Sequence, residues 1–164
     1  KCLILNEMEN KHYIAITGII IKEGKYLITK RSPTKKAFPN KWTVPGGNLE
    51  VEDYIALPKD TSVHWYNIFE KVLRREVKEE VGLDIGNLKY LTSITFLKGE
   101  EPVLIVSMYA NYLSGEVVLN EESVEFAWIG LQEAKNYDLI EGIYEELEIL
   151  DKLLKRESAG EWKK

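Results

Sequence analysis

Residues 75–83 read Arg-Glu-Val-Lys-Glu-Glu-Val-Gly-Leu, and this stretch decides how the fold is interpreted. On a helical wheel that starts at Ile68 and turns by about 100° per residue, the three glutamates fall within an arc of about 100°. They are Glu79 at about 20°, Glu76 at about 80° and Glu80 at about 120°. This arc continues the apolar side of the helix, whereas a solvated face would lie opposite it, so the pattern favours a cleft.

Three like charges that point toward a cleft repel one another and are costly to remove from water, so they need a compensating partner. Arg75 is placed to pair with Glu79, four residues further along the helix. Hard divalent cations are the other usual partner, because carboxylate oxygens are the ligands that Mg²⁺ prefers. The segment therefore favours metal binding over an ordinary charged surface.

β-Branched and alternating segments on both sides of this helix predict a sheet. The first two form a hairpin around Glu23-Gly24, and the third, after the basic loop Arg31–Lys41, runs into the turn Pro45-Gly46-Gly47. The expected strands are Tyr13–Lys22, Lys25–Lys30, Trp42–Val44, Lys89–Leu97, Val103–Leu113 and Glu125–Ile129.

Two segments have a helical period. The first is expected from about Val63 to Val81, with Gly82 at C′ and with the N-cap candidates Asp60, Thr61 and Ser62. The second is Glu141–Lys155, whose inward stripe is Ile143, Leu147, Leu150 and Leu154. The order β-β-β-α-β-β-β-α predicts an α/β (α+β) fold, a sandwich in which helices cover a mixed β-sheet.

The composition bounds the class of protein. The 164 residues fit a single domain, 1–164, and the net charge of -5 argues against nucleic-acid binding. Cys2 is the only cysteine, and His12 and His64 are the only histidines, so neither a disulfide nor a zinc site is expected. No apolar stretch is long enough to span a bilayer and no secretory signal is visible, which predicts a cytoplasmic protein without membrane contacts.

Together with Gly47, residues 75–83 resemble the Nudix box, G-x5-E-x7-R-E-U-x-E-E-x-G-U, in which U is a bulky aliphatic residue. The second half matches at every fixed position. The resemblance to this family, of MutT-like type, implies an α/β/α sandwich with a mixed sheet. It also implies hydrolysis of a nucleoside diphosphate linked to another group, with Mg²⁺ or Mn²⁺ as the cofactor.

The first half of the box departs from the motif. Counting forward from Gly47, the box glutamate falls on Asp53, whereas counting back from Arg75 it falls on Asn67. The simplest explanation is an insertion between Asp53 and Asn67. Glu50 and Glu52 are alternatives to Asp53, and the aromatic residues of the insert could instead shape the substrate pocket; they are Tyr54, Trp65 and Tyr66.

The resemblance also implies roles for particular residues. The catalytic set would be Arg75, Glu76, Glu79 and Glu80, with Arg75 orienting a glutamate and either Glu79 or Glu80 acting as the base. The metal ligands would be Glu76, Glu79, Glu80, the carbonyl of Gly46 and Glu122, with Glu125 as second choice to Glu122. The candidates for substrate binding are Arg31, Trp42, Gly47, Glu50, Asp53 and Tyr109.

Three functions remain open at this point. The default is a (d)NTP pyrophosphohydrolase, and the alternatives are an ADP-ribose or nucleotide-sugar pyrophosphatase and a non-catalytic nucleotide-binding domain. In each case the expected partner is a small nucleotide-like molecule. The exposed strands and the insert would support a homodimer, although nothing in the sequence requires one.

Overall fold

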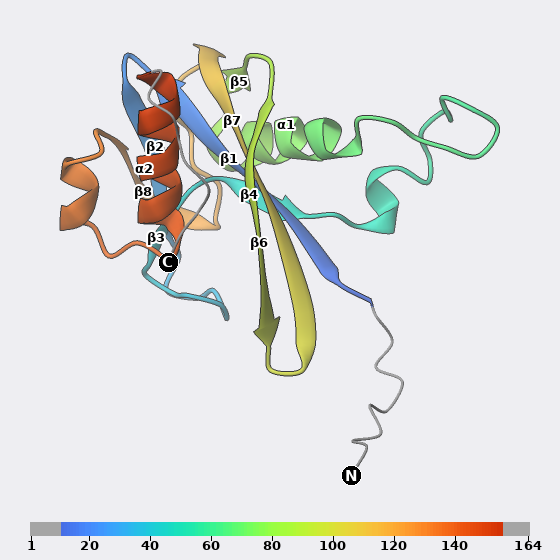
Figure 1. The fold of residues 1–164 in the computed structure, drawn as a ribbon, viewed down its shortest axis with the longest axis horizontal. Helices are drawn as coiled ribbons and strands as arrows, with labels where there is room; N and C mark the ends of the chain where they lie inside the picture. The colour runs from blue at the N-terminus through green and yellow to red at the C-terminus, as the bar shows by residue number, and fades with distance from the viewer. Residues whose placement is uncertain (1–10, 156–164) are drawn as a thin grey trace.

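The computed structural model describes residues 11–155, and Cys2 lies outside them. Two helices and eight strands form the fold, with short 3-10 turns at Val51–Asp53 and Glu133–Asn136 (Figure 1). The helices are α1 (Ile68–Val81) and α2 (Ile143–Leu154). The strands are β1 (Tyr13–Lys22), β2 (Lys25–Arg31), β3 (Trp42–Thr43), β4 (Gly46–Asn48), β5 (Asp84–Ile85), β6 (Lys89–Lys98), β7 (Glu101–Ser114) and β8 (Ser123–Ile129).

The sheet is mixed, as the sequence predicts. Its main path runs β3-β2-β1-β7-β5, while β4 pairs with β1, β6 with β7 and β8 with β2. Strands β1 and β7 are parallel over nine paired positions, from Tyr13 beside Val103 to Ile21 beside Asn111. The other pairings between strands are antiparallel.

Strand β1 lies in the middle of the sheet and is buried on both faces. Ile16 and Ile20 belong to the core under α1, whereas Ile19 and Ile21 belong to the core under α2. A strand covered on both faces needs a nearly continuous apolar sequence, which explains the run of isoleucines in β1. The two helices therefore cover opposite faces of the sheet, and the predicted α/β/α sandwich is confirmed.

Helix α1 starts at Ile68, later than the predicted start near Val63. The predicted caps do not act as caps, because Thr61 closes a local turn instead: its hydroxyl accepts hydrogen bonds from the backbone N–H groups of Val63 and His64. Asn67 precedes the helix in a left-handed conformation, with φ 56°. Gly82 ends it with φ 74°, as expected for a glycine at this position.

The second helix also differs at its ends. It begins at Ile143 rather than Glu141, and Ile143, Leu147 and Leu150 are buried as predicted. Leu154 is 45% exposed, so its assignment to the inward stripe is wrong. It lies in the last turn, beyond the residues that pack on the sheet. Neither helix among residues 11–155 is long and apolar enough to cross a membrane.

Candidate active site

The two glycines of the predicted turn belong to a strand, β4, which pairs with β1 and lies against α1. At Gly46 a Cβ atom would meet the carbonyl oxygen of Ile16 and come within 2.9 Å of Thr17 Cα. At Gly47 it would overlap the carboxyl group of Glu76, with Oε1 at 2.5 Å. Glycine at both positions lets the strand approach β1 on one side and the glutamates on the other.

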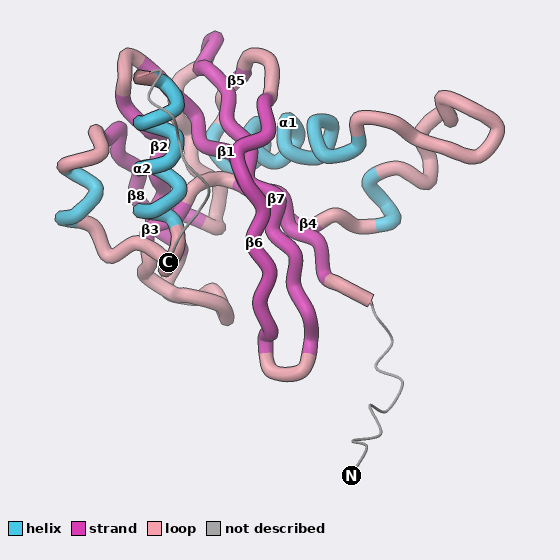
Figure 2. Tube along the Cα trace, viewed as in Figure 1, coloured by secondary structure: helices cyan, strands magenta, loops and turns pink. Residues whose placement is uncertain are grey.

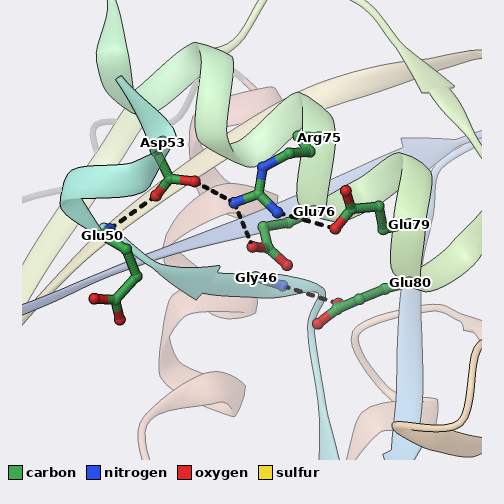
Figure 3. Close-up of polar contacts among 7 residues, drawn as sticks. All are labelled: Gly46, Glu50, Asp53, Arg75, Glu76, Glu79 and Glu80. Carbon is green, nitrogen blue, oxygen red and sulfur yellow. Dashed lines mark hydrogen bonds and ion pairs between the residues drawn. The ribbon is translucent and has the colours of Figure 1, made fainter. Parts of the chain in front are cut away.

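Arg75 holds three carboxylates together (Figure 3). Its guanidinium contacts Asp53 at 2.6 Å, Glu76 at 2.9 Å and Glu79 at 2.9 Å. The predicted ion pair with Glu79 is therefore present. The guanidinium supplies counter-charge for part of the glutamate cluster and fixes the side chains of Glu76 and Glu79.

The contact between Asp53 and Arg75 favours the forward count of the motif. The two residues are 22 positions apart, where the motif places them eight apart, yet their side chains touch. Asp53 also accepts a hydrogen bond from the backbone N–H of Glu50 at 2.8 Å. The extra residues form the loop 54–67, which extends past the start of α1 and away from the sheet (Figures 1 and 2).

Glu80 lies in a different environment from the Arg75 cluster. Its carboxylate accepts a hydrogen bond from the backbone N–H of Gly46 at 3.1 Å (Figure 3). Burial raises the pKa of Glu80 to about 8; the Gly46 hydrogen bond opposes the shift, and the negative charges of Glu76 and Glu122 add to it. Burial also raises the pKa of Glu76, and Arg75 opposes that shift.

The three glutamates are not equally buried, which corrects the interpretation of the helical wheel. Glu79 is exposed, with 56% of its side chain accessible, whereas the side chain of Glu76 is only 17% accessible. The buried positions of the helix span about 40° to about 220° on the wheel, so the core faces the middle of that range; they are Val72, Leu73, Val77 and Val81. Glu80 and Glu76 lie beside the core as expected, but Glu79, at about 20° on the wheel, lies outside the buried range.

A cavity of about 680 Å³ opens beside Glu80. Glu122 and Arg31 line it with Gly46 and Gly47, so the structure brings these candidates together. Glu122 also forms an ion pair with Lys35 at 2.8 Å. The second choice for this carboxylate, Glu125, instead pairs with Lys30 at 2.7 Å and does not line the cavity.

Other candidates lie elsewhere. Trp42 packs edge-on against Tyr137, with ring centroids 4.9 Å apart, and Tyr109 belongs to the core under α2. Glu50 contributes its backbone N–H to Asp53, and its carboxylate points away from the other glutamates (Figure 3). The structure therefore does not bring these three side chains into the cavity.

Sequence reasoning missed other cavity residues, among them Tyr13, Thr17, Phe38 and Phe96. The alternation of β1 could have shown that Tyr13 and Thr17 share a face. Nothing in the sequence could have placed Phe38 and Phe96 beside them, because that depends on how the loop 32–41 and strand β6 lie in space.

Within residues 11–155, no three carboxylate or imidazole groups are already arranged to hold a metal ion. Arg75 holds Glu76 and Glu79 on the side of Asp53, while Glu80 is turned toward Gly46 (Figure 3). The carboxylates nevertheless fit a hard cation, because carboxylate oxygens are the ligands that such a cation prefers and Glu80 has only the backbone N–H of Gly46 as a hydrogen-bond donor among residues 11–155.

A model of the NUDIX domain matches residues 11–148. The chain belongs to the Nudix domain family. The family prediction that rests on residues 75–83 is thus confirmed, and Arg75, Glu76, Glu79 and Glu80 lie on α1, the helix of the Nudix box.

Relatives and solved structures agree with this assignment. The nucleoside triphosphatase NudI of Klebsiella pneumoniae (strain 342) is 29% identical over 139 residues, 76% of this chain and 86% of that protein. The MutT protein from Methanosarcina mazei Go1 has a TM-score of 0.68 at 23% identity, over 90% of this chain and 99% of that one. An ADP-ribose pyrophosphatase from Streptococcus suis 89-1591 has a TM-score of 0.62 at 22% identity, over 93% of this chain and 97% of that one. Both structures confirm the fold.

Proposed function

We propose that this Nudix domain is a pyrophosphohydrolase that cleaves nucleoside triphosphates and releases pyrophosphate. The observation that carries the proposal is Glu80, a carboxyl group with its pKa raised to about 8 that lines the cavity together with Glu122. Strongly shifted groups that face a cavity are typical of catalytic sites. The similarity to a nucleoside triphosphatase supports the choice of substrate.

The cofactor in this proposal is Mg²⁺ or Mn²⁺. The residues that would hold it are Glu76, Glu79, Glu80, the carbonyl of Gly46 and Glu122. A bound divalent cation neutralises phosphate oxygens and lowers the pKa of a water molecule. All five groups offer oxygen ligands, which fits a hard cation better than a softer metal.

The remaining roles follow from position. Glu80 faces the cavity, so it is better placed than the exposed Glu79 to accept a proton from the attacking water. Arg75 positions Glu76 and Glu79 through its ion pairs. Arg31 and Lys36 line the same cavity and would bind the phosphates of the substrate.

The proposal is tested with a panel of (d)NTPs, ADP-ribose and nucleotide sugars, assayed with Mg²⁺, with Mn²⁺ and with a chelator. We expect pyrophosphate from the (d)NTPs and no turnover in the chelator. Turnover of ADP-ribose or nucleotide sugars alone, with two monophosphates as products, would replace this substrate class with the alternative one. Nucleotide binding without turnover of any compound would indicate a non-catalytic domain.

Four predictions from the sequence are carried forward as part of this proposal. They are a single domain over residues 1–164, a cytoplasmic location, a homodimer as an alternative to a monomer, and no nucleic-acid partner. Size-exclusion chromatography with light scattering tests the oligomeric state directly.

A further inference from the structure

The segment 115–122, which joins β7 to β8, packs along the last turn of α1. A Cβ atom at Gly115 would come within 2.9 Å of the carbonyl oxygen of Gly82. A Cβ atom at Gly82 would in turn come within 3.2 Å of the carbonyl oxygen of Glu116. Glycine at both positions therefore lets the two backbones run in close contact, and the segment lies directly against the helix that carries the glutamates.

The same segment supplies hydrogen-bond donors to the end of α1. The last carbonyl groups of a helix have no partner within the helix and need one from outside. The N–H of Val118 donates to the carbonyl of Val81 at 3.0 Å, and the N–H of Asn120 donates to the carbonyl of Glu80 at 3.2 Å. The second bond fixes the segment to the backbone of the residue whose carboxyl group lines the cavity.

Asn120 connects Glu80 to a second carboxylate of the cavity. Its side-chain oxygen accepts a hydrogen bond from the N–H of Glu122 at 2.9 Å, and its carbonyl accepts one from the N–H of Ser123 at 3.4 Å. An asparagine that closes a turn in this way fixes the backbone two residues further on. One residue thus holds the backbone of Glu80 with its N–H and the backbone of Glu122 with its side chain.

The carboxylate of Glu122 is held less firmly than its backbone. The carbonyl of Glu122 accepts a hydrogen bond from the N–H of Ser32 at 2.8 Å, so both of its backbone groups have partners. Its carboxylate forms an ion pair with Lys35 and is 43% exposed. Because an exposed ion pair contributes little free energy, the carboxylate can turn from Lys35 to a cation in the cavity without moving the backbone.

We propose that Asn120 is a positioning residue, which holds Glu122 in a fixed place relative to Glu80 so that both carboxylates bind one divalent cation. This inference rests on the proposed function, in which Glu80 and Glu122 are metal ligands. Groups that orient metal ligands from behind are typically worth about 10- to 100-fold in metal affinity. Without the side chain of Asn120 the turn would loosen, and Lys35 would keep Glu122 on the side of the loop 32–41.

The first test measures metal binding without hydrolysis. The probe is Mn²⁺, added to nucleotide-free protein, and the electron paramagnetic resonance signal of unbound Mn²⁺ gives the dissociation constant. We expect Asn120→Ala to raise this constant about tenfold or more. The backbone N–H of residue 120 is still present in this variant, so its bond to Glu80 and the fold should survive.

The matched control is Glu121→Gln. Glu121 is the exposed neighbour in the same turn and lies outside the cavity lining, so its loss of charge should change Mn²⁺ binding little. A rise in the dissociation constant as large as that in Asn120→Ala would show that the segment acts through its general charge or stability. That result would overturn the proposal.

A double-mutant cycle separates positioning from a general effect on the fold. Glu122→Gln alone should weaken Mn²⁺ binding, because it replaces a charged ligand with a neutral one. If Asn120 acts through Glu122, adding Asn120→Ala to Glu122→Gln should weaken binding no further. Losses that simply add would show that Asn120 does not act through Glu122, and the proposal would fail.

A conservative variant tests the hydrogen bond itself. Asn120→Ser keeps a side-chain oxygen that can close the same turn and adds no charge, whereas Asn120→Ala has no such acceptor. Mn²⁺ binding by Asn120→Ser should therefore lie between that of the wild type and that of Asn120→Ala. Equal losses in the two variants would count against the hydrogen bond as the cause.

The outcomes distinguish this inference from the proposed function. If the wild type binds Mn²⁺ and follows the cycle but hydrolyses no nucleotide, the proposed function fails and the role of Asn120 stands. If the wild type hydrolyses (d)NTPs while Asn120→Ala binds Mn²⁺ as tightly as the wild type, the role of Asn120 fails and the function stands. A wild type that binds no Mn²⁺ overturns the inference together with the metal ligands on which it rests.

Discussion

Two glutamates, one on each helix, have buried carboxyl groups, and they lie on opposite faces of the sheet. Glu146 of α2 is 4% exposed and accepts a hydrogen bond from Ser107 at 2.5 Å. Glu80 of α1 accepts one from the backbone of Gly46 at 3.1 Å. Burial raises the pKa of both carboxyl groups, so the shift alone does not distinguish a structural glutamate from a functional one.

Their surroundings make the distinction. Glu146 is enclosed in the core under α2, where a serine hydroxyl satisfies it. Glu80 lines an open cavity and feels the charges of two further carboxylates, Glu76 and Glu122. A cavity and a second carboxylate, rather than burial, therefore identify the site.

The largest expected effect comes from removing the charge of Glu80. Glu80→Gln should lower kcat/KM about 10²- to 10⁴-fold, the range typical of losing a general base. In metal-free protein its thermal midpoint should stay the same at neutral pH, where the carboxyl group is mostly protonated, and rise above about pH 8, where the amide replaces a buried charge. Glu146→Gln is the matched control and should keep its kcat/KM. Equal losses of activity in the two variants would contradict the distinction.

A smaller loss of activity is expected at Gly47. The Cβ atom of Gly47→Ala would displace the carboxyl group of Glu76, a flexible side chain, so kcat/KM should fall while the fold survives. Gly46→Ala meets the backbone of β1 instead and should destabilise the protein by about 1–3 kcal/mol. Chemical denaturation and steady-state kinetics on both variants check this. A larger loss of stability in Gly47→Ala than in Gly46→Ala would contradict the prediction.

Both glutamates should make the stability of the protein depend on pH, and the contribution of Glu80 should respond to Mg²⁺. Both have a pKa raised above that of the unfolded chain, so the folded protein binds more protons and is stabilised at low pH. In metal-free protein, the free energy of unfolding should therefore fall as the pH rises from about 5 to 8. Glu80→Gln should flatten this slope, and Mg²⁺ should flatten it in the wild type but not in Glu80→Gln. A slope that rises with pH would refute the assignment.

The smallest effect is expected in the inserted loop. Trp65 packs on Tyr54, with centroids 5.2 Å apart, and donates a hydrogen bond to the carbonyl of Leu57. These contacts stay within the insert, so Trp65→Ala should leave kcat/KM unchanged and lower the thermal midpoint less than Gly46→Ala does. A clear loss of activity would support the alternative that the insert shapes the substrate pocket.

The helix and its glutamates could be predicted because their spacing is local. A period of 3.6 residues places Glu76 and Glu80 beside the core, whatever the rest of the chain does. The start of the helix could not be predicted, because Thr61 and Asp60 fit both a cap and a local turn. The shared position of Phe38 and Phe96 in the cavity lining could not be predicted either, because it depends on the pairing of β1 with β7 and of β7 with β6, and on the path of a loop.

Arg75 contacts both Asp53, before the insert, and Glu79, after it. The loop 54–67 therefore leaves from a residue held by Arg75 and returns directly into the helix that carries Arg75, so we expect that its length can change without moving the glutamates. For a protein engineer this makes the tip of the loop a place to graft a reporter peptide or a small folded module. For evolution, it is a position where new recognition surfaces can be tried while the chemistry stays intact.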